Sequence, residues 1–145
     1  MITRILLAVD DSPGALAAAR VAVDLAARLG ARLRVVNVVQ DGRLAETLEA
    51  ASGSPGLRER RGSAAAALLD HVGELARRSG VAVETCQLEG SPARRILDEA
   101  QAWAADLTVM ARSQRRHRAG DPYIGSETAH VLEFTEQPVL VVPRT

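Results

Sequence analysis

The chain has 145 residues, of which 47% are apolar and 25% charged, and its formal net charge is zero. This length and composition are typical of one globular domain, so we expect residues 1–145 to form a single domain. A neutral chain with only 2% aromatic residues lacks the charge and the stacking side chains on which binding to nucleic acids or anionic membranes depends.

The first third of the chain predicts two strands joined by a helix. The apolar run from Arg4 to Asp11 indicates a strand buried on both faces. Ser12 as N-cap and Pro13 as first helical residue then begin a helix that stops at Gly30. A second strand ends at Val39. Residues 41–62 are interrupted by glycine and proline, and we expect a flexible loop there, with room for a short helix at 44–51.

The rest of the chain continues the alternation of helix and strand. Helical spacing of apolar residues or a Ser-Pro or Gly-Ser start predicts helices at 63–79, 91–104 and 125–135. Short apolar runs predict strands at 81–90, 105–111 and 137–144. Strict alternation favours an α/β fold, with a mostly parallel five-stranded sheet and helices on both faces.

Three segments follow strands that should be neighbours, and they mark the expected ligand site. Asp10–Ser12 follows the first strand, Asn37–Val39 ends the second, and Met110–Ser113 ends the fourth. Ligands of open parallel sheets lie at the carboxyl ends of the strands, where the winding direction changes. Helices starting near Ser12 and Ser126 would direct free N–H groups at the same crevice. The sequence therefore predicts an anion site at this edge.

Three stretches of the chain resemble the universal stress protein family: "ILLAVDDSPGALAAARVAVDLAARLGARLRVVNVV", "EGSPARRILDEAQAWAADLTVMARS" and "GSETAHVLEFTEQPVLVVP". Together they span nearly the whole chain apart from the middle loop. The resemblance implies a Rossmann-like domain with strand order 3-2-1-4-5 and a role in stress survival or regulation. Many members of the family bind ATP, and others function without it.

The phosphate-binding motif of the ATP-binding members is only half kept. Those members have Gly-x-x-Gly, nine further residues, and Gly-Ser or Gly-Thr. Here Ala111 and Gln114 take the places of the two glycines, and ten residues separate Gln114 from Gly125-Ser126. The arginines between Arg112 and Arg118 could rebuild a phosphate site, since guanidinium groups pair well with phosphate oxygens. Alternatively, this basic segment is a solvated loop.

The resemblance also implies roles for individual residues. Asp10 would contact the ribose or adenine, Val38 the adenine through its backbone, and Met110 would flank the base. Gly125, Ser126 and Thr128 would contact the phosphates of ATP or another adenine nucleotide, with Mg²⁺ present only alongside the nucleotide. The full candidate set is Ala8, Val9, Asp10, Val38, Met110, Ala111, Arg112, Gln114, Gly125, Ser126 and Thr128.

Other chemistry finds little support in the sequence. All basic residues are arginine, which excludes a Walker A lysine, a Schiff-base lysine and the lysine of receiver domains. The three histidines have no metal-ligand spacing, and we expect no metal site. Cys86 is the only cysteine, so no internal disulfide can form, which suits the cytoplasm. No apolar run is long enough for a membrane span.

The last strand predicts a homodimer. In the implied order it is an edge strand, and its exposed backbone can pair with a second chain. The pairing segment is Val139, Leu140, Val141 and Val142, between Pro138 and Pro143.

Three functions remain open from the sequence. The first is a non-catalytic regulatory protein with a modified or vestigial adenine-nucleotide site and an unidentified protein partner. The second is a nucleotide-free, dimeric interaction protein of the stress response, which would use the loops at 40–62 or 112–123. The third is a slow ATPase acting through Ser126 or Ser113.

Overall fold

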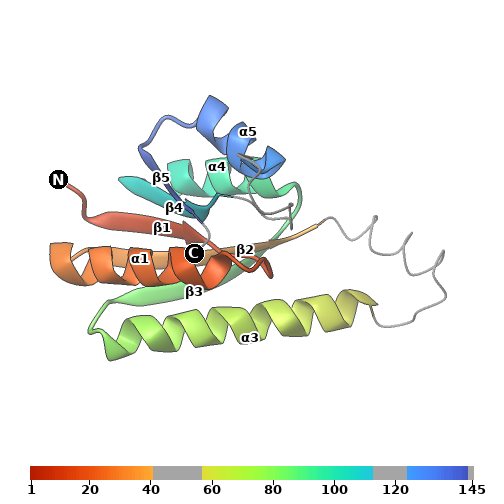
Figure 1. The fold of residues 1–145 in the computed structure, drawn as a ribbon, viewed down its shortest axis with the longest axis horizontal. Coiled ribbons are helices and arrows are strands. Elements are labelled where there is room, and N and C mark those ends of the chain that lie inside the picture. Colours follow the sequence, from red (N-terminus) through yellow and green to blue (C-terminus); the bar gives the residue numbers. More distant parts are fainter. Residues whose placement is uncertain (41–56, 113–123, 144–145) are drawn as a thin grey trace.

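The computed structural model describes residues 1–40, 57–112 and 124–143. They form one parallel sheet with the strand order β3-β2-β1-β4-β5 (Figure 1). The strands are β1 (Arg4–Ala8), β2 (Arg32–Val39), β3 (Val83–Glu89), β4 (Leu107–Ala111) and β5 (Val139–Val142). The helices are α1 (Ala15–Leu29), α3 (Leu57–Arg78), α4 (Pro92–Ala102) and α5 (Ser126–Phe134). The predicted fold class and strand order are thereby confirmed.

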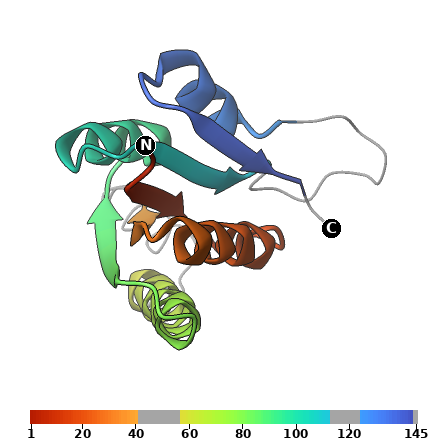
Figure 2. The same cartoon turned by 90° about the vertical axis from the view of Figure 1, so that its left-hand side faces the viewer.

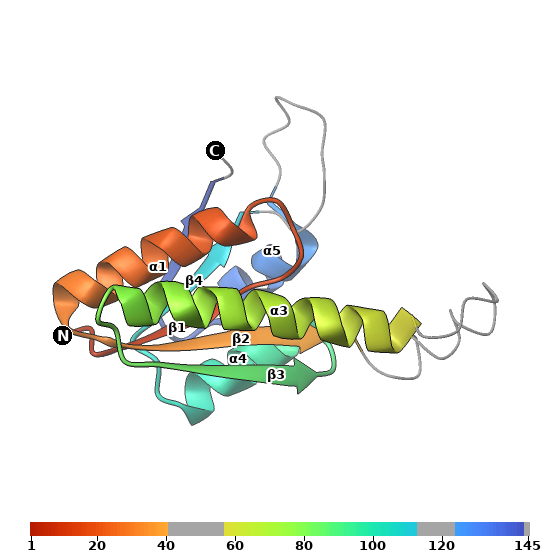
Figure 3. The ribbon, with the colours of Figure 1, turned by 90° about the horizontal axis from the view of Figure 1, so that it is seen from below.

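Helices cover both faces of the sheet. Seen along the sheet, α1 and α3 lie on one side and α4 and α5 on the other (Figure 2). From below, α1 and α3 run side by side in front of the strands (Figure 3). The side chains of β1 alternate between the two layers, because Ile5 and Leu7 pack under α1 and α3 whereas Leu6 and Ala8 pack under α4 and α5. The central strand is therefore apolar on both faces, as its sequence predicted.

The first helix approaches the sheet closely because its buried face is made of small residues. That face consists of Ala15, Ala18, Ala19, Ala22, Val23 and Ala26. The helix ends at Gly30, whose φ of 65° is left-handed and whose N–H closes the last turn on the carbonyl of Ala26. Glycine takes this conformation without the strain that a Cβ would bring, so the predicted stop at Gly30 is confirmed.

The predicted start of the same helix was wrong. The N-cap is Gly14 and the helix begins at Ala15, while Ser12 and Pro13 belong to a preceding turn. The turn closes when the N–H of Ala15 donates to the carbonyl oxygen of Ser12, 3.2 Å away. A Ser-Pro-Gly sequence suits a turn as well as a helix start, and here the turn prevails.

The long helix α3 begins earlier than the sequence suggested. It covers Leu57–Arg78, so residues 57–62 are helical and not part of a flexible loop. Leucine, arginine and glutamate are good helix formers, and their summed preference tolerates the single Gly62. The rest of the expected loop, residues 41–56, lies outside the described residues. Neither α3 nor any other helix in the described ranges has the length and apolar character needed to cross a membrane.

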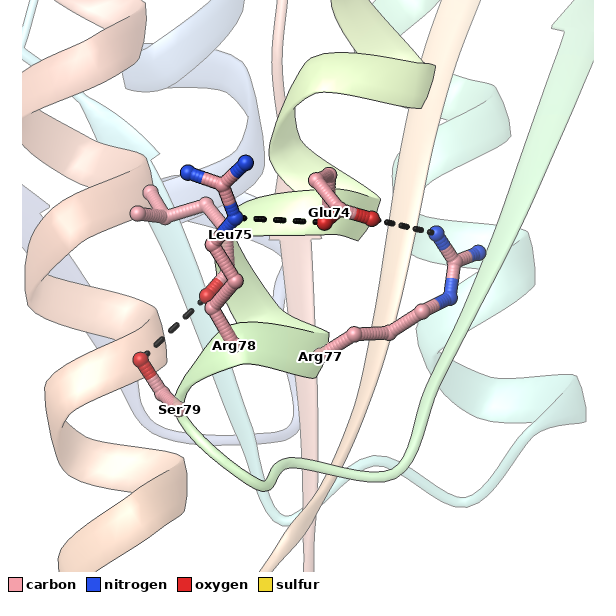
Figure 4. A network of polar contacts seen from close by, with 5 residues as sticks. All are labelled: Glu74, Leu75, Arg77, Arg78 and Ser79. Atoms are coloured by element: carbon pink, nitrogen blue, oxygen red, sulfur yellow. Dashed lines mark hydrogen bonds and ion pairs between the residues drawn. The ribbon is translucent and has the colours of Figure 1, made fainter.

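Two ion pairs lie on the surface of the last turns of α3. Glu74 lies between Arg77 and Arg78, with nitrogen–oxygen distances of 3.9 and 3.2 Å, and the hydroxyl of Ser79 donates to the carbonyl of Leu75 (Figure 4). The side chains of Glu74, Arg77 and Arg78 are each more than half exposed. Solvent screens such pairs, and each contributes well under about 1 kcal/mol to stability.

A carboxylate fastens the amino ends of the two central strands. Oδ2 of Asp106 accepts hydrogen bonds from the backbone N–H groups of Thr3 and Arg4, both at 2.9 Å, and from the hydroxyl of Thr3 at 3.0 Å. These hydrogen bonds, the backbone bond from Thr3 first, lower the pKa of Asp106 below its ordinary value. The cluster joins the start of β1 to the start of β4, at the end of the sheet remote from the predicted ligand site.

Candidate functional site

The candidate site begins where β1 and β2 end side by side. The N–H of Val9 donates to the carbonyl of Val36 over 2.9 Å, and the side-chain amide of Asn37 donates to the carbonyl of Val9 over 2.8 Å. Asn37 is buried, so this bond forms away from water. These two bonds hold the backbone of Val9 against β2. They thereby fix the backbone position from which the side chain of the next residue, Asp10, extends.

Asp10 is a partly buried carboxylate at this point. Burial raises its pKa above the ordinary value, and the nearby charge of Asp11 raises it further, while contacts with Ser12 oppose the shift. One of those contacts is the hydrogen bond that the N–H of Ser12 donates to Oδ1 of Asp10, at 2.9 Å. The hydroxyl of Ser12 is buried beside this carboxylate and makes no other hydrogen bond in the described part of the chain. A carboxylate and a hydroxyl with spare hydrogen-bonding capacity are suited to contact polar groups of a ligand.

A small pocket lies between the ends of these strands and the start of α4. Its volume is about 40 Å³, and its lining is Ala8, Val9, Asp10, Val36, Val38, Pro92 and Ile96. Four of these residues, Ala8, Val9, Asp10 and Val38, belong to the predicted set, and the structure brings them together. Small-molecule sites typically measure several hundred Å³, so a base could enter only if α4 or the side chains facing it moved aside.

The other side of the site is the junction between β4 and α5. The N–H of Gly125 donates to the carbonyl of Arg112 at 3.0 Å, and the hydroxyl of Thr128 donates to the carbonyl of Ala111, also at 3.0 Å. The start of α5 is thus fixed to the end of β4. Gly125 is the N-cap, with Ser126 as the first helical residue, exposed to solvent. The N–H groups of a first helical turn lack partners within the helix, and with the helix dipole they favour an anion.

The methyl group of Ala111, which stands where the family has glycine, is accommodated inside the fold. Ala111 is buried and packs on the α1 side of the sheet. It faces Gly14, where an added Cβ would lie only 3.3 Å from the Cβ of Ala111. The space left by the missing side chain of Gly14 therefore receives this methyl, and the methyl is not directed at the junction with α5.

Two further predicted residues are absorbed into the core. Met110 is 1% exposed and packs beneath α4 and α5. Thr128 is 0% exposed, and its hydroxyl is already engaged with Ala111. A nucleotide could reach either side chain only after local rearrangement. Gln114, the second departure from the glycine motif, lies outside the described residues, as do Ser113, Arg115, Arg116, His117 and Arg118.

Sequence reasoning missed the contributions of α4. Pro92 and Ile96 line the pocket, and the N–H of Ala93 donates to Oε2 of Glu127 at 2.8 Å. The Ser-Pro start of α4 after β3 was a usable signal, since that helix begins at the carboxyl edge of the sheet. No sequence signal connects Glu127 with Ala93, because their contact depends on how α4 packs against α5.

The described residues contain no cluster of three or more histidine, cysteine, aspartate or glutamate side chains able to hold a metal ion. The polar groups at the carboxyl edge instead include one partly buried carboxylate, one buried hydroxyl and a helix N-terminus. This combination is suited to recognise a ligand that carries both hydroxyl groups and negative charge.

Comparisons with known proteins agree with this architecture. The model of the universal stress protein family matches residues 1–143. Among solved structures, universal stress protein UspA from Lactobacillus plantarum is 26% identical, with a TM-score of 0.83 and 97% of each chain covered. A universal stress protein family member from Burkholderia pseudomallei is 28% identical, with a TM-score of 0.73, covering 98% of this chain and 96% of its own.

A third structure is the universal stress protein from Archaeoglobus fulgidus in complex with dAMP. It is 21% identical, with a TM-score of 0.67, and the match covers 98% of this chain and 99% of the other. The search of curated proteins gives no match. Because the family model covers nearly the entire chain, the protein belongs to the universal stress protein family.

Proposed function

We propose that this protein is a non-catalytic regulatory member of its family that binds an adenine nucleotide at the carboxyl edge of the sheet. The observation that carries the proposal is the position of Asp10. Its carboxylate is partly buried in the wall of a pocket at the point where the strand order reverses. Burying a carboxylate costs free energy unless a partner repays it, and a ligand hydroxyl is such a partner.

In the proposed complex, the residues at the ends of β1 and β2 contact the ribose and base, and the start of α5 contacts the phosphate. Asp10 accepts hydrogen bonds from the ribose, and the backbone of Val9 and Val38 faces the base. The first-turn N–H groups of α5, beginning at Ser126, meet the phosphate. The relative in complex with dAMP supports a ligand of this chemistry in the same fold. Mg²⁺ enters only with a nucleotide that has enough phosphates to bind it.

Binding without turnover is favoured by the side chains that the site offers. The chain has no lysine to stabilise a transferring phosphoryl group. Of the two serines named for ATP hydrolysis, Ser126 is exposed to solvent at the start of α5, and Ser113 lies outside the described residues. We therefore expect phosphate release from ATP to stay at the buffer background.

Calorimetric titration tests the proposal directly. The protein is titrated with adenosine, AMP, ADP and ATP, with and without Mg²⁺, after removal of any nucleotide carried through purification. Asp10→Ala and Gly125→Val should both abolish the heat of binding. Asp24→Ala is the matched control, because Asp24 is an exposed α1 residue that pairs only with Arg28 in the described structure. Absence of heat with all four ligands would refute the proposal.

A second candidate function is a nucleotide-free, dimeric interaction protein with a regulatory partner. The small volume of the pocket favours it, as does the exposed Leu140 on the edge strand β5. An antiparallel pair of β5 strands would extend the sheet across two chains. A protein that is dimeric in solution but gives no heat with any adenine nucleotide would have this function.

A further inference from the structure

Helix α4 receives its N-terminal cap from another helix. Ser91 occupies the N-cap position with extended backbone angles, yet its side chain makes no capping hydrogen bond. The bond comes from Glu127 in the first turn of α5, whose Oε2 accepts the N–H of Ala93 at 2.8 Å. A carboxylate at a helix N-terminus is stabilised both by the hydrogen bond and by the helix dipole.

The same carboxylate links the two helices whose first turns border the proposed site. Glu127 directly follows Ser126, where we place the phosphate, and its partner Ala93 directly follows Pro92, which lines the pocket beside Asp10. Glu127 is partly buried, so salt screens its charge less than that of a fully exposed residue. Any anion bound at the start of α5 is therefore close to a fixed negative charge.

We infer that Glu127 sets how much negative charge the nucleotide site accepts, and that it favours an adenine nucleoside or monophosphate over the triphosphate. The inference rests on the proposed function. Each phosphate added to the ligand brings further negative charge toward the carboxylate. The charge of Arg112, which directly follows β4, is the same in the wild type and in a Glu127 variant, so neutralising Glu127 isolates the contribution of the carboxylate.

The decisive variant is Glu127→Gln. Glutamine keeps an oxygen that can accept the N–H of Ala93, so the link between α4 and α5 is retained while the charge is lost. The matched control is Glu133→Gln, which removes the same charge from an exposed position of the same helix, about 9 Å further along its axis. Wild type and both variants are titrated at low salt with adenosine, AMP, ADP and ATP.

We expect Glu127→Gln to strengthen binding of ATP about threefold or more, as a unit charge repelling several others at close range predicts. Adenosine binding should change less than about twofold because adenosine carries no charge. The gain for ATP should shrink at high salt. Glu133→Gln should leave all four affinities within about twofold of wild type.

Each outcome is decisive. If adenosine or AMP binds the wild type but Glu127→Gln leaves the ratio of ATP to adenosine affinity unchanged, or Glu133→Gln raises it equally, this inference fails and the proposed function stands. If none of the four ligands binds the wild type, both this inference and the proposed function are refuted. If circular dichroism shows that Glu127→Gln does not fold, the wild-type series decides. ATP affinity that is equal to or weaker than AMP affinity then supports the inference, and tighter binding of ATP than of AMP overturns it.

Discussion

The hydroxyl of Thr128 donates a 3.0 Å hydrogen bond to the carbonyl oxygen of Ala111, and both residues are buried. This one bond joins the first turn of α5 to the last residue of β4. The end of β4 and the start of α5 therefore keep a fixed relation, although the two bonded residues are 17 positions apart in the sequence.

The contribution of this bond can be measured with a pair of identical substitutions. Thr128→Val keeps the shape but leaves a buried carbonyl without this donor, and should lower the free energy of unfolding by about 1–2 kcal/mol. Thr108 is equally buried, but its hydroxyl has no hydrogen-bond partner in the described structure. Thr108→Val should be neutral or stabilise by up to about 1 kcal/mol. Urea unfolding followed by circular dichroism measures both, and equal losses would contradict the assignment.

Asp10 should show opposite effects on stability and on binding. Its folded pKa is raised, so the folded state binds the proton more tightly than the unfolded state. Stability therefore falls as the pH rises from the unfolded pKa through the folded pKa. Asp10→Asn does not titrate, and without ligand it should be at least as stable as wild type at pH 7.

The same variant should bind adenine nucleotides about tenfold more weakly or worse, since it loses hydrogen bonds to a charged group. Urea unfolding at pH 4, 5.5 and 7, together with calorimetry, separates the two effects. A variant that is less stable than wild type at pH 7 and still binds normally would show that Asp10 serves the fold alone.

Asp106 should give the reverse pH dependence. Its folded pKa is lowered, so its contribution to stability is complete above the unfolded pKa and disappears as the pH falls through the folded value. Asp106→Asn should be less stable than wild type at pH 7, and the difference should narrow below about pH 3.8. The control is Asp24→Asn, which removes a charge from an exposed position of α1. A difference that stays constant from pH 7 to pH 3 would speak against the three hydrogen bonds.

The edge strand gives a prediction about assembly. Leu140 is 36% exposed on β5, so Leu140→Lys should leave the fold intact while placing a charge in the proposed pairing segment. We expect light scattering to show a dimer for wild type and a monomer for the variant. Thr85→Lys, at an exposed position of the opposite edge strand β3, should remain dimeric. If Leu140→Lys is still a dimer, the chains associate through another surface.

The sheet was predictable because its strands are short apolar runs separated by helices, and a central strand such as β1 is buried on both faces. The boundaries of the helices were less predictable than the strands. Ser12, Pro13 and Gly14 satisfy the requirements of a turn and of a helix start equally well, and only packing decides between them. The first turns of α3 were missed because residues 57–62 were assigned to the loop with the glycine- and proline-containing segment before them, although leucine, arginine and glutamate are good helix formers.

The candidate site was predictable on the strand side and not on the helix side. Ala8, Val9, Asp10 and Val38 follow from the rule that ligands meet the carboxyl ends of parallel strands. Ile96 enters the pocket only because α4 crosses the sheet at a particular height, and Glu127 meets Ala93 only because of how α5 lies beside it. Such relations arise from tertiary packing, for which one sequence carries no local pattern.

The bonds that Asp106 accepts from Thr3 and Arg4 span 103 and 102 positions of the chain, and this fixes an order of events during synthesis. β1 can pair with β2 as soon as residue 39 has left the ribosome, but its other edge must wait for β4. In the interval that edge has unpaired backbone and apolar side chains, a state that attracts other chains. We therefore expect the nascent polypeptide to be most prone to association with other chains after β2 has emerged and before β4 has done so.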